Sequence, residues 1–160
     1  MSPRAACRLE RLGFTTVFDY VTGLADWTAN GLPTEGTLTS VLKAGDVVQR
    51  DVQTCRPTER LGDVAKRLKA AGENLCIVTT EDGVVLGRLR SDALEGDPDA
   101  SVESIMESGP ATIRPDTGLA EFTEHMRARR VGSIVVTTST GQLIGVLYRR
   151  DAEAKLGNVN

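Results

Sequence analysis

The sequence predicts an α/β (α+β) fold of two consecutive β-α-β-β-α units, preceded by a short helix-strand-helix extension. Two observations lead to this prediction. The chain matches itself when it is displaced by 58 residues, and in each copy a helical spacing of apolar residues gives way to two short apolar runs around a glycine turn. A repeat of this length is typical of duplicated supersecondary units that pack together.

The extension occupies residues 1–36 and repeats nothing that follows it. Its pattern predicts a helix, a turn, a short strand and a second helix, at Arg4–Leu12, Gly13, Thr15–Tyr20, and around Trp27 up to Gly31 and Pro33. Leaving its large apolar side chains in water would cost about 1.5–3 kcal/mol each. We therefore expect the extension to dock on the repeated units or on a second chain through Phe14, Phe18, Tyr20, Trp27 and Leu32.

The repeat begins with a strand and a helix in each unit. Residues 54–72 read TCRPTERLGDVAKRLKAAG and residues 112–130 read TIRPDTGLAEFTEHMRARR. Proline ends the first strand of each copy, and the side chains of Thr58 and Asp116 are expected to cap the helix that follows. Apolar residues then recur at helical spacing and predict a buried stripe: Leu61, Val64, Ala65, Leu68 and Ala71 in the first unit, Leu119, Phe122, Met126 and Val131 in the second.

Two strands and a closing helix complete each unit. The strands are predicted at Cys76–Thr80 and Val84–Leu89 in the first unit, and at Ile134–Thr138 and Gln142–Tyr148 in the second. Asp-Gly and Thr-Gly supply the positive φ that the intervening turns need. Short helices are expected around Ser91–Leu94 and Arg149–Leu156, and the linker 96–101 leads through a short helix from Ser101 into the second unit.

Together these residues carry a resemblance. Two such units, with RPD and GQLIGVLYRRD in the second, resemble a pair of CBS domains, with the first domain at 44–96 and the second at 101–156. The resemblance implies a disc-shaped, non-catalytic regulatory pair that associates as a homodimer through its helices. The stretch LGFTTVFDYVTGLADWTANGLP (12–33) is similar to the C-terminal tail of a rhodanese-like sulfurtransferase domain. In that family the catalytic cysteine loop lies upstream of this helix, and Cys7 does not replace it.

Composition excludes several other classes of function. A formal charge of −3 and 4% aromatic residues argue against nucleic-acid binding, and no apolar run is long enough for a signal peptide or a membrane span. Three irregularly spaced cysteines suggest free thiols, so we expect a cytoplasmic protein. One histidine, His125, excludes a histidine-rich metal centre and is interpreted as a surface residue.

The resemblance also implies where a ligand would bind. CBS pairs bind adenosine ligands such as AMP, ADP, ATP or S-adenosylmethionine, and a Gly-apolar-X-Ser/Thr-X-X-Asp pattern holds the ribose. In the second unit Gly145 and Asp151 fit the pattern, but Tyr148 takes the hydroxyl position; in the first, Arg90 takes that position and Asp92 comes one residue early. The nearby arginines are candidates for phosphate binding. The candidate ligand-binding residues are Thr54, Arg90, Asp92, Thr112, Arg114, Tyr148, Arg149, Arg150 and Asp151; no catalytic residue, metal or cofactor is expected.

Three functions stay open on this evidence. The first is a regulatory module that senses a small phosphorylated ligand and acts through packing within a dimer or against a protein partner. The second is a ligand-free interaction or dimerisation scaffold, which the imperfect ribose patterns favour. The third is the remnant of a fusion with a rhodanese-like sulfurtransferase.

Overall fold

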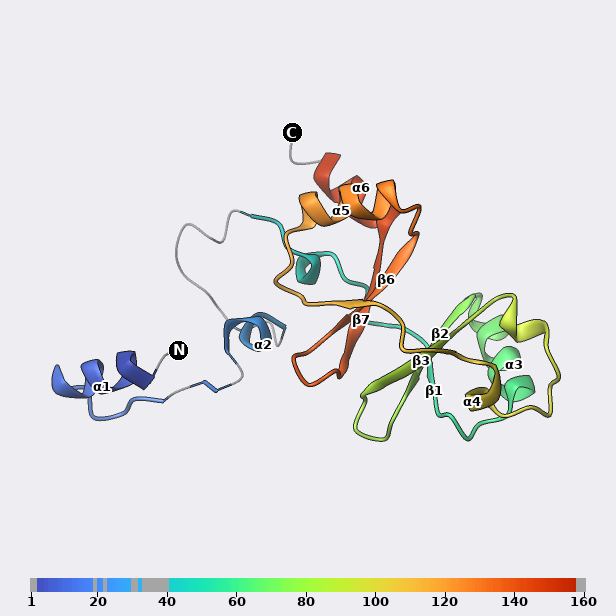
Figure 1. Cartoon of the computed structure of the whole chain (residues 1–160), viewed down its shortest axis with the longest axis horizontal. Coiled ribbons are helices and arrows are strands. Elements are labelled where there is room, and N and C mark those ends of the chain that lie inside the picture. Colours follow the sequence, from blue (N-terminus) through green and yellow to red (C-terminus); the bar gives the residue numbers. More distant parts are fainter. Residues whose placement is uncertain (1–2, 19, 22, 30–31, 33–40, 158–160) are drawn as a thin grey trace.

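The computed structural model describes residues 3–18, 20–21, 23–29, 32 and 41–157. Two small α+β units lie next to one another, each with its own sheet and helices (Figure 1). This arrangement confirms the predicted fold class, and the order of elements in each unit follows the repeat in the sequence.

The first unit is a four-stranded sheet covered by one long helix. Its strands lie in the order β1-β2-β3-β4, with β1 parallel to β2 and the other pairs antiparallel. The elements are β1 (Thr54–Cys55), α3 (Leu61–Ala71), β2 (Leu75–Thr79), β3 (Val85–Arg90), the 3-10 turn η3 (Ala93–Glu95), α4 (Val102–Ile105) and β4 (Glu107–Ser108).

The second unit repeats this plan with three strands in the order β5-β6-β7. Its elements are β5 (Thr112–Ile113), α5 (Leu119–Ala128), β6 (Ser133–Thr137), β7 (Leu143–Tyr148) and α6 (Arg149–Gly157), and the 3-10 turn η2 (Ala44–Asp46) packs against them from earlier in the chain. Gly83 and Gly141 adopt φ values of 79° and 84° in the two hairpins, as their turns require.

Each unit is completed by a segment that sequence order would assign elsewhere. Ala44 lies in the core of the second unit with Leu119 and Met126, and Gln49 forms a two-bond bridge with Val146 of β7. Val102 lies in the core of the first unit. The linker helix predicted from Ser101 does form, but it covers the first unit instead of leading away from it.

These crossing segments also explain why one prediction is wrong. Neither Thr58 nor Asp116 caps a helix, since α3 and α5 begin three residues later, at Leu61 and Leu119. The first amides of these helices instead donate to carbonyl groups of the crossing segments. Leu61 N–H donates to Ala100 O at 2.9 Å, and Leu119 N–H donates to Leu42 O at 2.9 Å. A backbone partner therefore satisfies the donors that a side-chain cap would otherwise satisfy.

A shared apolar layer joins the two sheets. Leu75, Ile77, Val135 and Val146 form one buried cluster that draws residues from both units. The hairpins are also bonded to one another, because Val85 N–H donates to Gly141 O at 3.0 Å. The predicted burial of the helical apolar residues is confirmed for most of them: Leu61, Val64, Leu68, Leu119 and Met126 are buried. Ala71, at the end of α3, is exposed instead.

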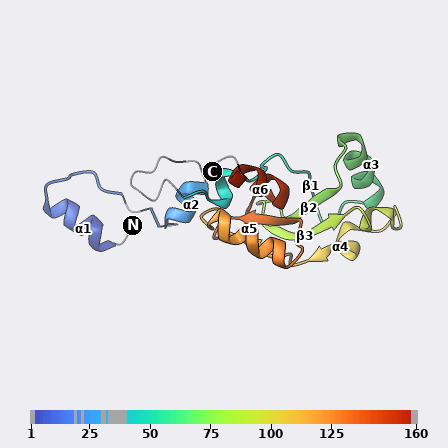
Figure 2. The ribbon, with the colours of Figure 1, turned by 90° about the horizontal axis from the view of Figure 1, so that it is seen from above.

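The extension contains the two predicted helices but no strand among its described residues. Helix α1 spans Pro3–Arg11 and α2 spans Gly23–Ala29, while residues 15–18 and 20 are irregular. The predicted end of the second helix, at residues 31 and 33, lies outside the described residues. Seen from above, α1 stands away from both units (Figure 2).

Two of the apolar side chains of the extension do not dock on the units as expected. Phe14 and Phe18 are 59% and 81% exposed, so docking on the repeated units is wrong for these two residues. Tyr20 and Trp27 instead pack edge to face, with ring centroids 5.2 Å apart. Docking on a second chain stays a prediction. No helix within the described ranges is long and apolar enough to cross a membrane.

Candidate functional site

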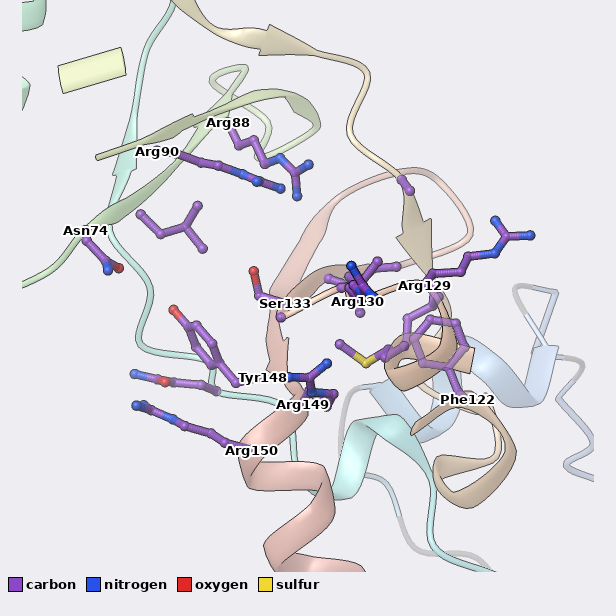
Figure 3. Close-up of a pocket in the computed structure, with 18 of the residues that line it drawn as sticks. Asn74, Arg88, Arg90, Phe122, Arg129, Arg130, Ser133, Tyr148, Arg149 and Arg150 are labelled. Carbon is purple, nitrogen blue, oxygen red and sulfur yellow. The ribbon is translucent and has the colours of Figure 1, made fainter. Parts of the chain in front are cut away.

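A large cleft lies between the two units. It has a volume of about 1160 Å³ and forms where β2 begins and β3 ends, facing the point where β6 begins and β7 ends (Figure 3). These four places correspond through the sequence repeat, since residues 72–75 match 130–133. The cleft is thus built from equivalent positions of the two units.

Six arginines line this cleft, against two glutamates. The first unit supplies two arginines and the second supplies four: Arg88, Arg90, Arg129, Arg130, Arg149 and Arg150. The glutamates are Glu73 and Glu153. Because the whole chain carries a formal charge of −3, this cleft concentrates positive charge within an acidic protein. Such a surface attracts anions.

Glu107 of β4 holds the arginines of the first unit in place. Arg88 donates to both carboxylate oxygens of Glu107, at 2.8 and 2.6 Å, and only 13% of the Arg88 side chain is exposed. Arg90 approaches the same carboxylate at 3.7 Å. The hydrogen bond from Arg88 lowers the pKa of Glu107 below its usual value, so this carboxylate is ionised at neutral pH.

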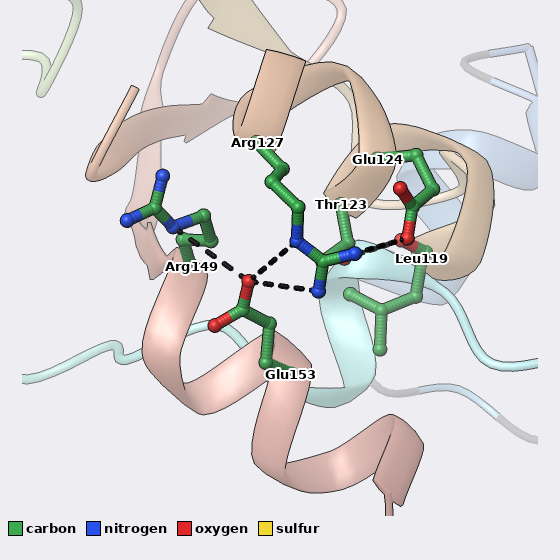
Figure 4. Close-up of polar contacts among 6 residues, drawn as sticks. All are labelled: Leu119, Thr123, Glu124, Arg127, Arg149 and Glu153. Carbon is green, nitrogen blue, oxygen red and sulfur yellow. Dashed lines mark hydrogen bonds and ion pairs between the residues drawn. The ribbon is translucent and has the colours of Figure 1, made fainter. Parts of the chain in front are cut away.

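Glu153 plays the corresponding part in the second unit. It contacts Arg149 at 3.8 Å and Arg127 at 3.1 Å, and Arg127 also pairs with Glu124 at 2.7 Å (Figure 4). This network connects α5 to α6 at the edge of the cleft. Among the described ion pairs, none includes Arg129 or Arg130.

Arg130 has an unusual backbone conformation. Its φ of 56° makes it the one non-glycine residue with positive φ in the described chain, and it lies two residues beyond the end of α5 at Ala128. At the equivalent position of the first unit, Gly72 ends α3 with a φ of 69°. A residue with a Cβ atom loses about 1 kcal/mol or more in this conformation, whereas glycine does not. The second unit therefore carries an arginine, with this cost in strain, at the position where the first unit has glycine.

Tyr148, Asn74 and Ser133 add uncharged groups to the cleft (Figure 3). The guanidinium of Arg150 lies over the Tyr148 ring, 5.3 Å from its centroid. Burial raises the pKa of the Tyr148 hydroxyl, which stays protonated at neutral pH. Partly buried Phe122 stacks on His125 at 5.9 Å, and both line the cleft. The cleft thus offers aromatic faces as well as cations.

The structure brings five of the predicted ligand-binding residues together in this cleft. They are Arg90, Thr112, Tyr148, Arg149 and Arg150. The two aspartates lie outside its lining. Asp151 is in the first turn of α6, where it accepts a hydrogen bond from Arg150 Nε at 3.2 Å, and Asp92 is exposed at the start of η3.

The other two predicted residues lie elsewhere. Thr54 lines a second, smaller cleft of about 590 Å³ at the hairpin end of the units. The guanidinium of Arg114 donates to the Thr137 hydroxyl at 3.0 Å. Its counterpart in the first unit, Arg56, donates to the Thr79 hydroxyl at 2.8 Å. Each arginine therefore links the residues that follow the first strand of its unit (β1 or β5) to the end of the next strand (β2 or β6).

Sequence reasoning did not select several residues that line the cleft. Arg88 and Ser133 lie on strands whose residues alternate between faces, Asn74 directly precedes a strand, and no motif marked any of the three. Arg130 had a usable signal, because the repeat aligns it with Gly72. His125 is exposed, as interpreted, but it also lines the cleft.

Neither a metal centre nor a disulfide is present among the described residues. No group of three or more His, Cys, Asp or Glu side chains there could hold a metal ion. All three cysteines are free; Cys55 and Cys76 are buried in the core of the first unit, and Cys7 is exposed on α1.

Comparisons with known structures agree on the fold. The CBS domains of a transcriptional regulator from Streptococcus pneumoniae match with a TM-score of 0.65 and 18% identity, covering 72% of this chain and 99% of theirs. CBSX2 in complex with AMP matches at 0.65 and 16% identity, covering 73% and 97%. The CBS domain pair of protein MJ0100, in complex with 5-methylthioadenosine and S-adenosyl-L-methionine, matches at 0.63 and 16% identity, covering 75% and 99%.

Comparison with curated protein sequences gave no significant match. The CBS domain family model, in contrast, matches twice, over residues 44–94 and 102–156. These two matches cover more than half of the chain, one for each copy of the sequence repeat. The chain therefore belongs to the CBS domain family.

Proposed function

We propose that this chain is a regulatory module that binds an adenine nucleotide in the cleft between its two units. The observation that carries this proposal is the gathering of six arginines in one cleft of an acidic chain. Arginine pairs with phosphate through two parallel hydrogen bonds, which gives both affinity and orientation. Structures with the same fold hold AMP in CBSX2, and 5-methylthioadenosine and S-adenosyl-L-methionine in MJ0100. The matched family is not a catalytic one.

The remaining lining suits the other parts of a nucleotide. The Tyr148 ring provides a face for a base, and Asn74 and Ser133 provide donors and acceptors for its edge. Asp151 follows Arg150 directly and already accepts a hydrogen bond from it. Asp151 lies outside the lining of the cleft, next to Arg150 at its edge. In our proposal its carboxylate turns from Arg150 to a ribose hydroxyl when the ligand binds, and so serves as the ribose ligand expected from the sequence.

The signal would arise from the way the cleft is built. Its walls come from both units, so a ligand that contacts both favours one relative position of the units over others. A ligand shifts such an equilibrium only through its different affinities for the two states. We propose that a homodimer or a protein partner reads this change.

The exposed apolar side chains of the extension favour an association role as well. Phe14, Phe18 and Val21 are 59%, 81% and 90% exposed. By contrast, the exposed positions of α3 and α5 carry charged residues such as Lys66 and Glu124. A scaffold that dimerises without a ligand is therefore the second candidate function, and its contact surface would include the extension.

A thermal-shift screen tests the proposed function. The chain would be melted with AMP, ADP, ATP and S-adenosylmethionine, alongside Tyr148→Ala and the control Arg60→Ala, which removes a 70%-exposed arginine paired with Asp99 outside the cleft. A ligand at 100 times its Kd stabilises the folded state by about 2.7 kcal/mol. We expect one ligand to raise the melting temperature of the original chain and Arg60→Ala, and to do so less in Tyr148→Ala. No shift with any ligand at millimolar concentration would leave the scaffold as the better account.

A further inference from the structure

We propose that helix α1 of one copy of this chain docks on the acidic segment of a second copy, defined as residues 92–103, and that two such contacts close a two-fold dimer. This inference rests on the association proposed above and names its two surfaces, and it requires no ligand. Three observations support it: the uncovered apolar side chains of the extension, the opposite charges of the two surfaces, and their positions in the molecule.

The extension exposes large apolar side chains that the rest of the described chain does not cover. Leu12 is 68% exposed, and Phe14, Phe18 and Val21 are exposed as well. Within residues 44–157, by contrast, Ile105 of α4 is the one large apolar side chain that is exposed. Exposed apolar side chains in such number mark an interaction surface, because their burial drives association.

Helix α1 places positive charge beside these apolar side chains. Arg8 and Arg11 are exposed and, three residues apart, lie on the same side of the helix. Leu9 and Leu12 follow these arginines directly and lie on the neighbouring side, since Leu12 N–H still donates to Arg8 O at 3.1 Å. The described ion pairs include neither arginine. The helix therefore offers a basic strip next to an apolar one.

The acidic segment carries the complementary charge. It contains no basic residue and five exposed acidic ones: Asp92, Glu95, Asp97, Asp99 and Glu103. Among the described ion pairs, only Asp99 of these five has a partner, Arg60. Exposed Ile105 lies directly after the segment. Because opposite charges attract and like charges repel, this surface suits α1 and rejects a second acidic segment.

The acidic segment is a fixed surface of the first unit. Gly62 N–H donates to Pro98 O and Leu61 N–H donates to Ala100 O, both at 2.9 Å. The side chain of Val102 is fully buried in the core of that unit. A partner that binds the segment therefore meets carboxylates on an ordered backbone, which lowers the entropic cost of docking.

The two surfaces lie toward opposite ends of the molecule. In both views α1 is at one end, and α4 with the acidic segment is near the other (Figures 1 and 2). Helix α1 of one copy therefore meets the acidic segment of another when the two copies lie side by side and antiparallel. A two-fold axis between them repeats the contact, so that the dimer closes without leaving either surface free.

Sedimentation velocity of charge-reversed full chains tests the inference. Arg8→Glu with Arg11→Glu makes α1 acidic, and Glu95→Arg with Asp97→Arg reverses charge on the acidic segment. Each contact occurs twice in the dimer, so we expect either double variant to raise the dimer dissociation constant by about a hundredfold or more. Unchanged melting temperatures would show that both variants are folded.

An equimolar mixture of the two variants gives the sharpest result. In a mixed dimer the acidic α1 of one variant faces the reversed segment of the other, and the second contact has the original charges on both sides. We expect the mixture to form a dimer about as tightly as the original chain, although each variant alone is monomeric. Lys66→Glu with Lys69→Glu, the same change of charge on exposed positions of α3, should leave the dimer intact.

The other possible results would overturn the inference. These are an original chain that stays monomeric up to its solubility limit, a dimer that neither variant weakens, and a mixture that stays monomeric. Loss of the dimer in the α3 variant would assign the contact to the helices of the units. A monomeric chain that sediments with vesicles of phosphatidylcholine and phosphatidylserine would assign the extension to a membrane surface. Nucleotide binding is decided separately by the thermal-shift screen.

Discussion

Gly145→Ala tests the contact that attaches the segment before β1 to the second unit. A Cβ atom at Gly145 would overlap the carbonyl oxygen of Gln49 and lie 2.9 Å from its carbonyl carbon, so the backbone itself must move. That movement would break two hydrogen bonds of 2.9 Å between Gln49 and Val146. Overpacking costs about 1–3 kcal/mol, and each lost bond costs about 0.5–1.5 kcal/mol. We therefore expect the free energy of unfolding to fall by about 4 kcal/mol.

Gly87→Ala is the matched control, because the sequence repeat aligns Gly87 with Gly145. There the added Cβ would meet the sulfur of Met106 at 2.6 Å, the flexible end of a side chain, and the carbonyl oxygen of Glu107 at 3.0 Å. We expect this variant to lose only about 1–2 kcal/mol. Urea denaturation at constant m-value measures both losses. If the two variants lost equal stability, the crossing segment would not be held as described.

Three further predictions concern the ion pairs, the hairpin contact and the extension. Glu107→Gln should lower the free energy of unfolding by less than about 1 kcal/mol at pH 7, since the carboxylate is 52% exposed. Because the pKa of Glu107 is lowered in the fold, this contribution is present above the usual value of 4.5 and is lost as the pH falls through the lowered pKa, so the urea midpoints of the two chains should approach one another with increasing acidity. Arg114→Ala should lower the melting temperature by removing about 1–2 kcal/mol of hydrogen bonding, with unchanged nucleotide affinity, and a loss of affinity alone would contradict the contacts described here. Replacing Phe14 and Phe18 together by Ser should shift a homodimer toward monomer in sedimentation velocity if the extension is part of the interface, and an unchanged dimer would exclude these residues from it.

The repeated part of the fold could be predicted closely because local patterns decide it. Apolar spacing located α3 and α5, and the glycine turns at 83 and 141 located the hairpins to within one or two residues. The crossing segments could not be found in this way. Residues 42–49 and 98–106 pack on units that are distant or already passed in the sequence, and no local pattern states which sheet a segment will cover. The helix caps predicted at Thr58 and Asp116 were wrong for the same reason, because the crossing segments supply the partners of the first helical amides.

The candidate site was predictable only in part, for a related reason. Arg90, Tyr148 and Arg149 were predicted because they stand at the ends of predicted strands, where the resemblance to CBS pairs implies a ligand, and all three line the cleft. Arg88 and Asn74 join them only after the two sheets pack together, which depends on the shared apolar layer around Ile77 and Val135. The extension shows a different limit. Its apolar residues predicted a buried face, but the sequence does not say which surface would cover that face, and Phe14 and Phe18 are exposed.

The most direct test of the central claim is an ¹H–¹⁵N correlation spectrum of the labelled chain titrated with ATP. Binding in the arginine cleft predicts that the amide shifts which move most belong to Gly72–Leu75, Arg130–Ser133 and Tyr148–Arg150, at equivalent places in both units. Shifts confined to the second cleft, around Gly83 and Gln142, would place the ligand at the other end of the units. That result, or a spectrum unchanged by millimolar ATP, would contradict the account.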